Sequence, residues 1–383
     1  MVEDTKMALF VTCATALEPL LMDELCQLGI EPRCLQAGYR GVYVYEWKWS
    51  TVYKINYASR LASRVLLPLS RFKCYGKESL YKGASLIDWS RYIKIPCSIA
   101  IDANVSHREL RNSLFAAQVV KDAICDQLRN KTGRRPTINV QEPDVQLNLY
   151  IQNDTAVISF DTSGAPLHKR GYRQESVEAP LKETLAAAIL HLSRFSAESI
   201  MLDPCCGSGT LLTEAALIAT STPPGYIRRK WGFMSHPDYN QIDWLHEKNA
   251  LDKERIDLPS GRLFGMDINR EAVRICKVNL RAAGFADKVE VHQDDFRNTV
   301  SPIKPTIIIA NPPYGKRMED IERLGSLYKD LGDFLKRYCV KPGFGYIFTG
   351  NLDLAKQIGL AASRRYVLSN GAIDARLLEF EIY

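Results

Sequence analysis

The sequence predicts an α/β protein in which a doubly wound sheet follows two smaller α+β domains. From about Glu175 onward, strand-like runs alternate with helical patterns, and this alternation builds a parallel sheet with helices on both faces. Before that point, helical patterns are interleaved with short strands and a hairpin instead. The length of 383 residues fits two or three domains.

The first 165 residues show two α+β patterns in succession. Apolar runs and polar–apolar alternation indicate strands, and leucine or mixed apolar stripes at helical spacing indicate helices. The turn Gln152–Asp154 separates two strand patterns and predicts a hairpin. We expect strands at 8–12, 41–45, 98–105, 148–151 and 156–160, and helices at 17–28, 51–66 and 113–131.

The remaining residues follow a regular order of strand and helix. A Pro- and charge-rich stretch at 221–261 interrupts it and is interpreted as an insertion lying over the ligand-binding edge of the sheet. We expect helices at 181–192, 210–220, 270–283 and 323–339, and strands at 199–203, 262–267, 288–292, 306–310 and 345–348, with a closing pair near 366–368 and 377–382.

Composition excludes several classes of protein. Hydrophobic residues at 46% and charged residues at 25% are typical of a globular chain. No run approaches the roughly 18 apolar residues of a membrane helix, and the first residues do not resemble a signal peptide. The ten cysteines form no C-x-x-C pair and no cluster with His at zinc spacing. We therefore expect a cytoplasmic protein with reduced cysteines, no membrane association and no metal.

The net charge of +6 is unevenly distributed along the chain. It is −1 over residues 1–60, +6 over residues 61–175 and +1 over residues 176–383. The excess indicates a module that contacts a polyanion, although six extra charges also fit an ordinary solvated surface. Short basic clusters in this region suit phosphate contacts. The candidate RNA-binding residues are Arg108, Arg111, Arg134, Arg135, Lys169, Arg170 and Arg173.

The strongest local motif is DPCCGSGT, which follows a predicted strand and opens a helix. Its two glycines allow a sharp turn and close approach to a ligand. The third glycine of a dinucleotide fingerprint and the lysine of a Walker A motif are absent. The acid at the strand end suits a positive ammonium or sulfonium group, although a plain strand–helix turn remains an alternative. The candidate ligand-binding residues are Asp203, Pro204, Cys205, Gly207, Ser208, Gly209 and Thr210.

Acids also end the next two predicted strands. Asp267, followed by Ile268, can accept hydrogen bonds from a ribose diol. Asp295 can accept from an adenine amino group, with Phe296 beside the ring. A lone acidic pair is usually a helix cap, but acids at three successive strand ends describe S-adenosylmethionine better than NAD.

The fourth strand end carries Asn311-Pro312-Pro313-Tyr314. The prolines fix the backbone, so that the Asn311 amide oxygen and the Pro312 carbonyl can accept hydrogen bonds from one exocyclic amino group. Tyr314 offers a face for a base taken out of its stack. Positioning of this kind can lower a barrier by about 7–11 kcal/mol. The pattern predicts methyl transfer to an exocyclic amine, with a simple proline turn as the alternative.

These motifs together resemble the RlmL-type bacterial 23S rRNA guanine-N2-methyltransferases. The similarity extends over nearly the whole chain and includes DPCCGSGT, NPPYGKRM, residues 161–173, 178–190 and 222–233, and SNGAID. It implies a ferredoxin-like domain at 1–65, a THUMP RNA-binding domain at 66–165 and a class I methyltransferase domain with an antiparallel last strand at 166–383. Cys205 stands where many relatives carry an aromatic residue.

The resemblance also implies activity and partners. The cofactor would be S-adenosylmethionine, held by the residues from Asp203 to Thr210, by Asp267 and Ile268, and by Asp295, Phe296 and Asn311. The residues Asn311–Tyr314 would hold the target guanine of 23S rRNA or of an assembling large ribosomal subunit. We expect a monomer or weak homodimer and, since no second methyltransferase domain follows, one modification. Alternatives are a tRNA guanine-N2 enzyme, a DNA adenine-N6 enzyme and a non-catalytic RNA-binding or ribosome-assembly factor.

Overall fold

The computed structural model describes residues 7–177, 180–299, 303–315, 318–371 and 373–383. The chain divides into two compact units. The N-terminal unit consists of Met1–Cys13, Leu21–Leu167 and Arg228–Asn249, and the C-terminal unit consists of Ala14–Leu20, His168–Ile227 and Ala250–Tyr383. None of the helices in the described ranges combines the length and apolar character needed to cross a membrane.

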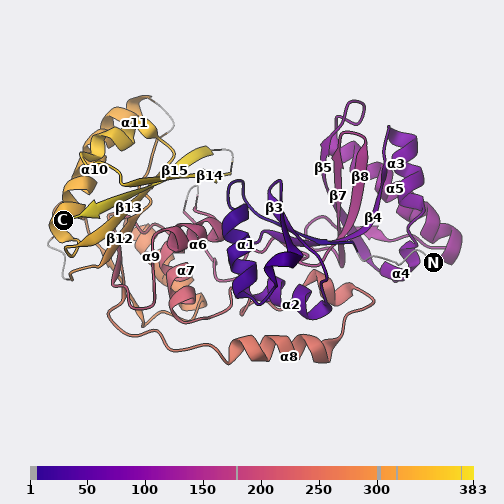
Figure 1. Cartoon of the computed structure of the whole chain (residues 1–383), viewed down its shortest axis with the longest axis horizontal. Coiled ribbons are helices and arrows are strands. Elements are labelled where there is room, and N and C mark those ends of the chain that lie inside the picture. Colours follow the sequence, from indigo (N-terminus) through magenta and orange to yellow (C-terminus); the bar gives the residue numbers. More distant parts are fainter. Residues whose placement is uncertain (1–6, 178–179, 300–302, 316–317, 372) are drawn as a thin grey trace. The chain divides into compact units, whose positions relative to one another are not determined.

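The N-terminal unit is built on one continuous sheet, shown from indigo to magenta in Figure 1. Its strand order is β2-β3-β1-β4-β8-β7-β5-β6 in the described part of the chain. Most neighbours are antiparallel, and β5 runs parallel to both β6 and β7. The strands are β1 (Leu9–Thr12), β2 (Leu35–Gly38), β3 (Gly41–Val44), β4 (Arg64–Lys73), β5 (Ser98–Ser106), β6 (Thr137–Ile138), β7 (Val145–Gln152) and β8 (Thr155–Asp161).

The long strand β4 connects the two halves of this sheet. It pairs with β1 on one side and with β8 on the other. The sequence predicted that a helix would continue to Leu66, and this was wrong: α2 ends at Ala58 and Arg64 already lies in β4. Long-range pairing with two strands outweighs the local helical spacing. The boundary expected between residues 65 and 66 falls inside this strand, so the three-domain division stays a prediction.

Helices cover one face of the N-terminal sheet. Figure 1 shows α3 and α5 along the same side of β7 and β8, and α5 packs against both α3 and β5. Helix α5 begins where the Asn112 side chain accepts a hydrogen bond from Phe115 N, and it ends at Gly133, whose φ is +71°. The helices are α1 (Glu18–Gln27), α2 (Trp49–Ala58), α3 (Lys77–Ser85), α4 (Trp89–Tyr92) and α5 (Ser113–Thr132), with a 3₁₀ turn at Pro32–Cys34.

The core of the N-terminal unit takes in part of the insertion. Residues Arg228–Asn249 belong to this unit, and Trp231, Phe233 and Trp244 are almost fully buried there. The ring of Trp244 lies 5.1 Å from Phe233 and 5.4 Å from Tyr57, between ring centroids. The prediction that this stretch lies over the ligand-binding edge was therefore wrong for these residues. Their large aromatic area is buried against α2 instead.

The C-terminal unit contains the doubly wound sheet. Its order is β11-β10-β9-β12-β13-β15-β14 among the described residues, and the first five strands are parallel. Strand β15 is antiparallel to both of its neighbours, which confirms the predicted antiparallel last strand. The strands are β9 (Met201–Asp203), β10 (Leu263–Asp267), β11 (Val289–Gln293), β12 (Ile307–Ala310), β13 (Gly343–Thr349), β14 (Arg364–Asn370) and β15 (Ile373–Ile382).

The strand order reverses between β9 and β12. The chain proceeds outward through β10 and β11 on one side, and it then returns to place β12 on the other side of β9. Ligands of doubly wound sheets bind at such a reversal, beyond the carboxyl ends of the strands. The segments that follow β9, β10, β11 and β12 are the ones that carry the sequence motifs.

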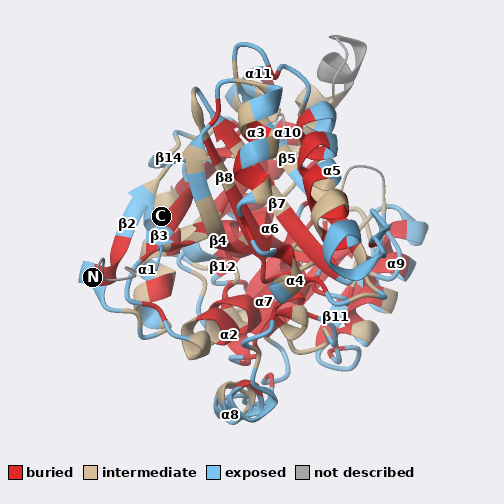
Figure 2. Ribbon diagram, turned by 90° about the vertical axis from the view of Figure 1, so that its right-hand side faces the viewer, coloured by how far each residue is buried: buried red, intermediate tan, exposed pale blue. Residues whose placement is uncertain are grey.

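The helices of the C-terminal unit bury the faces of this sheet. Figure 2 shows its central strand β12 and helices α6 and α7 largely in the colour of buried residues, whereas α8 is mostly exposed. Leu202, Ile308, Tyr328 and Leu335 form part of one apolar cluster. The helices are α6 (Glu183–Leu192), α7 (Thr210–Ala219), α8 (Gln241–Asp252), α9 (Arg270–Ala282), α10 (Met318–Tyr338) and α11 (Leu352–Ala355), with 3₁₀ turns at Gly232–Ser235 and Lys356–Ile358.

Candidate cofactor and substrate site

The glycine loop lies between β9 and α7, as the motif predicted. Gly207 and Gly209 have φ angles of +53° and +79°, which glycine adopts at little cost. A Cβ atom on Gly209 would lie 2.4 Å from the sulfur of Cys276 in α9. Cys206 N also donates a hydrogen bond of 2.9 Å to Met266 O in β10. The loop is therefore packed closely against the next strand and helix.

Two carboxyl groups lie beside this loop. Asp203 is 1% exposed, and burial raises its pKa to about 8 despite a hydrogen bond from Cys205 N. The charge of nearby Asp267 raises this pKa further. Asp267 Oδ2 accepts a hydrogen bond of 2.9 Å from Gly207 N, and its Oδ1 accepts one from Asn269 N. The second carboxylate thus keeps part of its acceptor capacity and lies directly against the loop.

The segments after β10 and β11 meet at the same edge of the sheet. Asp294 N donates a hydrogen bond of 3.1 Å to Asp267 O. Ile268 is 61% exposed, so its apolar side chain is free to cover a flat ring. Asp295 forms a two-pronged ion pair with Arg297, which lowers the pKa of the Asp295 carboxyl. Binding of an adenine amino group at Asp295 would have to share this carboxylate with Arg297.

Phe296 lies deeper than the sequence suggested. Its side chain is 5% exposed and its ring lies 5.4 Å from that of Phe334, in an edge-to-face arrangement. Most of the ring therefore belongs to the core of the unit. Contact with the cofactor through an edge of this ring stays a prediction.

The Asn-Pro-Pro-Tyr motif follows β12 directly. The side-chain oxygen of Asn311 is buried and has no hydrogen-bond partner in the described residues. Such an acceptor is costly unless a ligand supplies the donor. Pro312 is buried and Pro313 is exposed. The motif therefore presents an unused acceptor on a backbone that two prolines hold rigid.

Tyr314 is held by the neighbouring strands. Asn370 donates a hydrogen bond of 3.0 Å to its hydroxyl oxygen, and Asn351 donates one to its carbonyl oxygen. A Cβ on Gly350 would come within 3.0 Å of the ring. The sequence analysis missed Asn351, Asn370 and Gly350, because each lies beyond the next helix of the motif. Lys316 and Arg317 of NPPYGKRM, Glu178 and Ala179 of the 178–190 segment, and Ala372 of SNGAID lie outside the described residues.

Two of the arginines assigned to RNA lie inside the C-terminal unit. Arg170 is 3% exposed, and its Nε lies 3.5 Å from Glu214 in α7. Arg173 donates hydrogen bonds to Glu183, to loop residues and to a backbone carbonyl. The prediction that Arg170 and Arg173 contact RNA was wrong, because internal partners occupy these side chains. Lys169 is exposed and remains a candidate.

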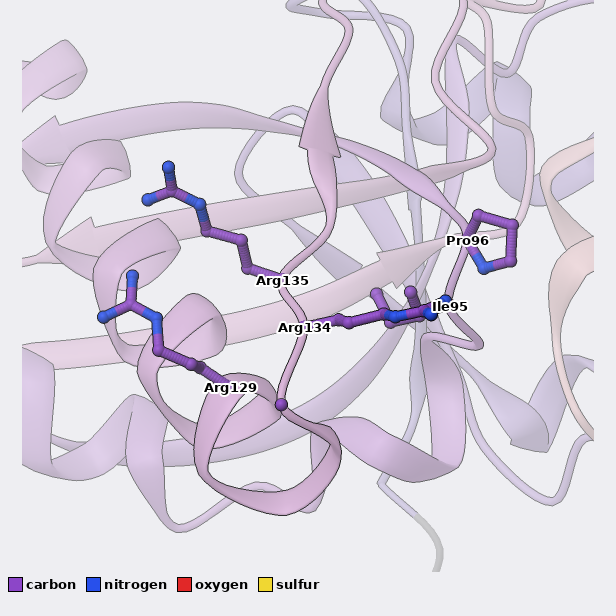
Figure 3. A pocket seen from close by; sticks show the side chains of 6 residues that line it. Ile95, Pro96, Arg129, Arg134 and Arg135 are labelled. Carbon is purple, nitrogen blue, oxygen red and sulfur yellow. The ribbon is translucent and has the colours of Figure 1, made fainter.

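The other basic candidates lie at the surface of the N-terminal unit. Arg108, Arg111, Arg134 and Arg135 are all exposed. Arg134 and Arg135 line an open pocket together with Arg129, Gly133, Ile95 and Pro96. Figure 3 shows the guanidinium groups of Arg129 and Arg135 pointing to the same side, while Arg134 extends toward Ile95 and Pro96. Three cations around one hollow suit a phosphate group.

No group of three or more His, Cys, Asp or Glu side chains within the described ranges is arranged to hold a metal ion. The site instead combines a glycine loop, carboxylates at two strand ends and the Asn-Pro-Pro-Tyr motif. All of these lie at the reversal of one doubly wound sheet. This arrangement can hold a cationic nucleoside and present an amino group to it.

Comparison with known proteins matches these features to one class. Residues 170–379 match the family model "RMKL-like, methyltransferase domain". Residues 76–161 match the THUMP domain, and residues 8–66 match the RlmL ferredoxin-like domain. The fold and site thus define a methyltransferase of the doubly wound type, preceded by domains found in RNA-modifying proteins.

Similar proteins cover the whole chain. The "Ribosomal RNA large subunit methyltransferase K/L" of Methylococcus capsulatus is 37% identical over 97% of this chain, which spans only 51% of that longer protein. The "Putative RNA methyltransferase slr0064" of Synechocystis is 34% identical over 98% of this chain and 96% of its own length. The crystal structure of SMU.472 complexed with SAH superposes with a TM-score of 0.86 at 27% identity, covering 99% of both chains. The chain belongs to the RMKL-like methyltransferase family.

Proposed function

We propose that this protein transfers a methyl group from S-adenosylmethionine to the exocyclic N2 amine of a guanosine in 23S rRNA. The observation that carries the proposal is the buried, unpartnered amide oxygen of Asn311 at the carboxyl end of β12. It is an acceptor placed beside the glycine loop, at the reversal of the sheet. The names of relatives and the SAH-bound neighbour support the cofactor and the RNA substrate class.

The residues present fit the proposed cofactor. When bound, S-adenosylmethionine supplies a methyl group on a positively charged sulfur. The residues Asp203 to Thr210 would hold the amino-acid part, with the Asp203 carboxylate opposite the ammonium group. Asp267 would accept from the ribose hydroxyls, and Ile268 would cover one face of the adenine. Asp295 and Phe296 complete the set proposed for the adenine.

The target base would be held by the Asn-Pro-Pro-Tyr residues. The Asn311 amide oxygen and the Pro312 carbonyl would accept the two N–H bonds of the guanine amine, and Tyr314 would stack on the ring. These acceptors turn the nitrogen lone pair toward the methyl group. The N–C bond forms as the S–C bond breaks, the sulfonium becomes a neutral thioether, and the methylated amine releases a proton to solvent.

The N-terminal unit would bind the RNA. Its exposed arginines at 108, 111, 134 and 135 would contact phosphates, which provide affinity but no sequence information. The pocket at Arg134 and Arg135 is the strongest candidate in this unit, because Arg129 adds a third cation. We propose that the protein acts as a monomer or weak homodimer, which sedimentation at micromolar concentration would test.

Mass spectrometry of nucleosides from a strain that lacks the gene tests the substrate. Loss of one N2-methylguanosine from 23S rRNA, with tRNA unchanged, is the expected result. Loss from tRNA alone would establish the tRNA enzyme instead, and no loss from either would favour a non-catalytic assembly factor. Asn311→Ala should lower methyl transfer by about 10²-fold or more, as expected for removal of a positioning acceptor. Unreduced product would refute the mechanism.

A further inference from the structure

Arg173 joins the glycine loop to the segment that precedes α6. Its Nε donates a hydrogen bond of 2.8 Å to Glu183, and its Nη1 donates one of 3.2 Å to Ser208 Oγ. Its Nη2 donates hydrogen bonds of 2.8 Å to Leu181 O and 3.0 Å to Thr210 Oγ1. All three guanidinium nitrogens are thus engaged inside the C-terminal unit, and two of the bonds end on loop hydroxyls.

The same segment is fixed to the loop a second time through Asn279. This fully buried side chain donates hydrogen bonds of 3.0 Å to Ser208 O and to Glu175 O, and its oxygen accepts one from Gln174 N. Ser208 is therefore held from its side chain by Arg173 and from its backbone by Asn279. Residues 173–175 and the loop form one connected hydrogen-bonded group.

The loop itself has little that could fix its shape. Gly207 and Gly209 carry no side chains, and both adopt positive φ angles that only weak local preferences maintain. External hydrogen bonds must therefore select the conformation that receives a ligand. Arginine suits this task because its planar fork reaches partners in several directions at once, whereas a lysine ammonium cannot.

We propose that Arg173 is a positioning residue for cofactor binding, which holds Ser208 to Thr210 in the geometry that receives the amino-acid half of S-adenosylmethionine. The inference rests on the proposed function. It predicts that the side chain matters for ligands that carry the amino-acid part and matters little for ligands that lack it. A role in folding alone would affect both kinds of ligand equally.

Calorimetric titration with S-adenosylhomocysteine and with 5′-methylthioadenosine separates these roles. Arg173→Met should weaken binding of the first by at least about tenfold, since several charge-assisted hydrogen bonds are lost. Binding of the second, which has no amino-acid part, should change by less than about threefold. Arg173→Lys, which keeps the charge, should recover part of the lost affinity. In turnover, KM for S-adenosylmethionine should rise more than kcat falls.

Arg274→Met provides the matched control. Arg274 pairs with Glu175 in the same segment and with Glu271 in α9, but its printed contacts do not include the loop. This variant should bind both ligands as the wild type does. Equal weakening of both ligands in Arg173→Met, or no weakening of either, would overturn the inference, and Arg173→Lys serves where the methionine variant does not fold. Failure of the wild-type protein to bind S-adenosylhomocysteine would refute the proposed cofactor instead.

Discussion

The ionisation of Asp203 should control the affinity for the cofactor. Burial raises the pKa of this carboxyl to about 8. Since each pH unit changes the ionised ratio tenfold, about a tenth of the free protein would carry the carboxylate at pH 7. The ammonium group of the ligand binds the carboxylate rather than the neutral acid. Below pH 8, binding must therefore release a proton from Asp203, and affinity must rise as the pH rises.

The magnitude follows from two titrations. The Asp203 carboxyl gains charge as the pH approaches 8, while the amino group of the ligand, with a pKa of about 8, loses its proton above it. The product of the two fractions rises about eightfold from pH 6 to pH 7 and about 2.5-fold more by pH 8, and it falls by pH 9. Titration of S-adenosylhomocysteine across this range, in buffers of different ionisation enthalpy, measures both the affinity and the proton release.

Two controls isolate the carboxyl group. Asp203→Asn should bind the ligand weakly at every pH and should lose the rise between pH 6 and pH 7. The wild-type protein should bind 5′-methylthioadenosine with little dependence on pH, because that ligand has no ammonium group. A flat affinity of the wild type for S-adenosylhomocysteine between pH 6 and pH 7 would refute the linkage to Asp203.

Three further changes test the packing and the RNA surface. Gly209→Ala should lower the free energy of unfolding by about 1–3 kcal/mol, because the new Cβ meets Cys276 and the backbone has a positive φ; an unchanged denaturant midpoint would contradict this. Trp244→Ala should cost about 3–5 kcal/mol, since it empties an aromatic core, and chemical denaturation measures the loss. Reversing the charge of Arg134 and Arg135 should weaken RNA binding most at low salt, by about 0.7 in the salt slope per phosphate lost, while S-adenosylhomocysteine binding stays the same; equal RNA affinity would place the footprint elsewhere.

The sequence predicted the catalytic sheet well because its signals are local. The strand before Asp203, the helix from Thr210 and the motif at Asn311 are each defined by adjacent residues. The parallel order then follows from the alternation of strand and helix, and that order brings the strand ends together. The expected residues at these ends therefore meet at one edge without any knowledge of long-range contacts.

The errors arose where distant residues decide the structure. Arg64–Lys73 is a strand because β1 and β8 pair with it, and its helical spacing carried no trace of those partners. Residues 228–249 join the N-terminal core because aromatic rings from α2 are available there. Asn279 did leave a signal: it is a polar residue on the buried stripe of α9, between Cys276 and Leu280. A buried asparagine on an apolar stripe needs partners, and here they are the loop and the segment before α6.

The arginines show why charge alone assigns function poorly. Arg134 and Arg173 both belong to the basic excess of residues 61–175, yet Arg134 is exposed and Arg173 is enclosed. Arg173 counters the carboxylate of Glu183 beside a loop that would receive a zwitterion, so its charge serves the cofactor side of the reaction. The excess that first indicated a polyanion is therefore divided between two tasks. Exposed arginines remain for RNA phosphates, and enclosed ones stabilise the domain that performs the chemistry.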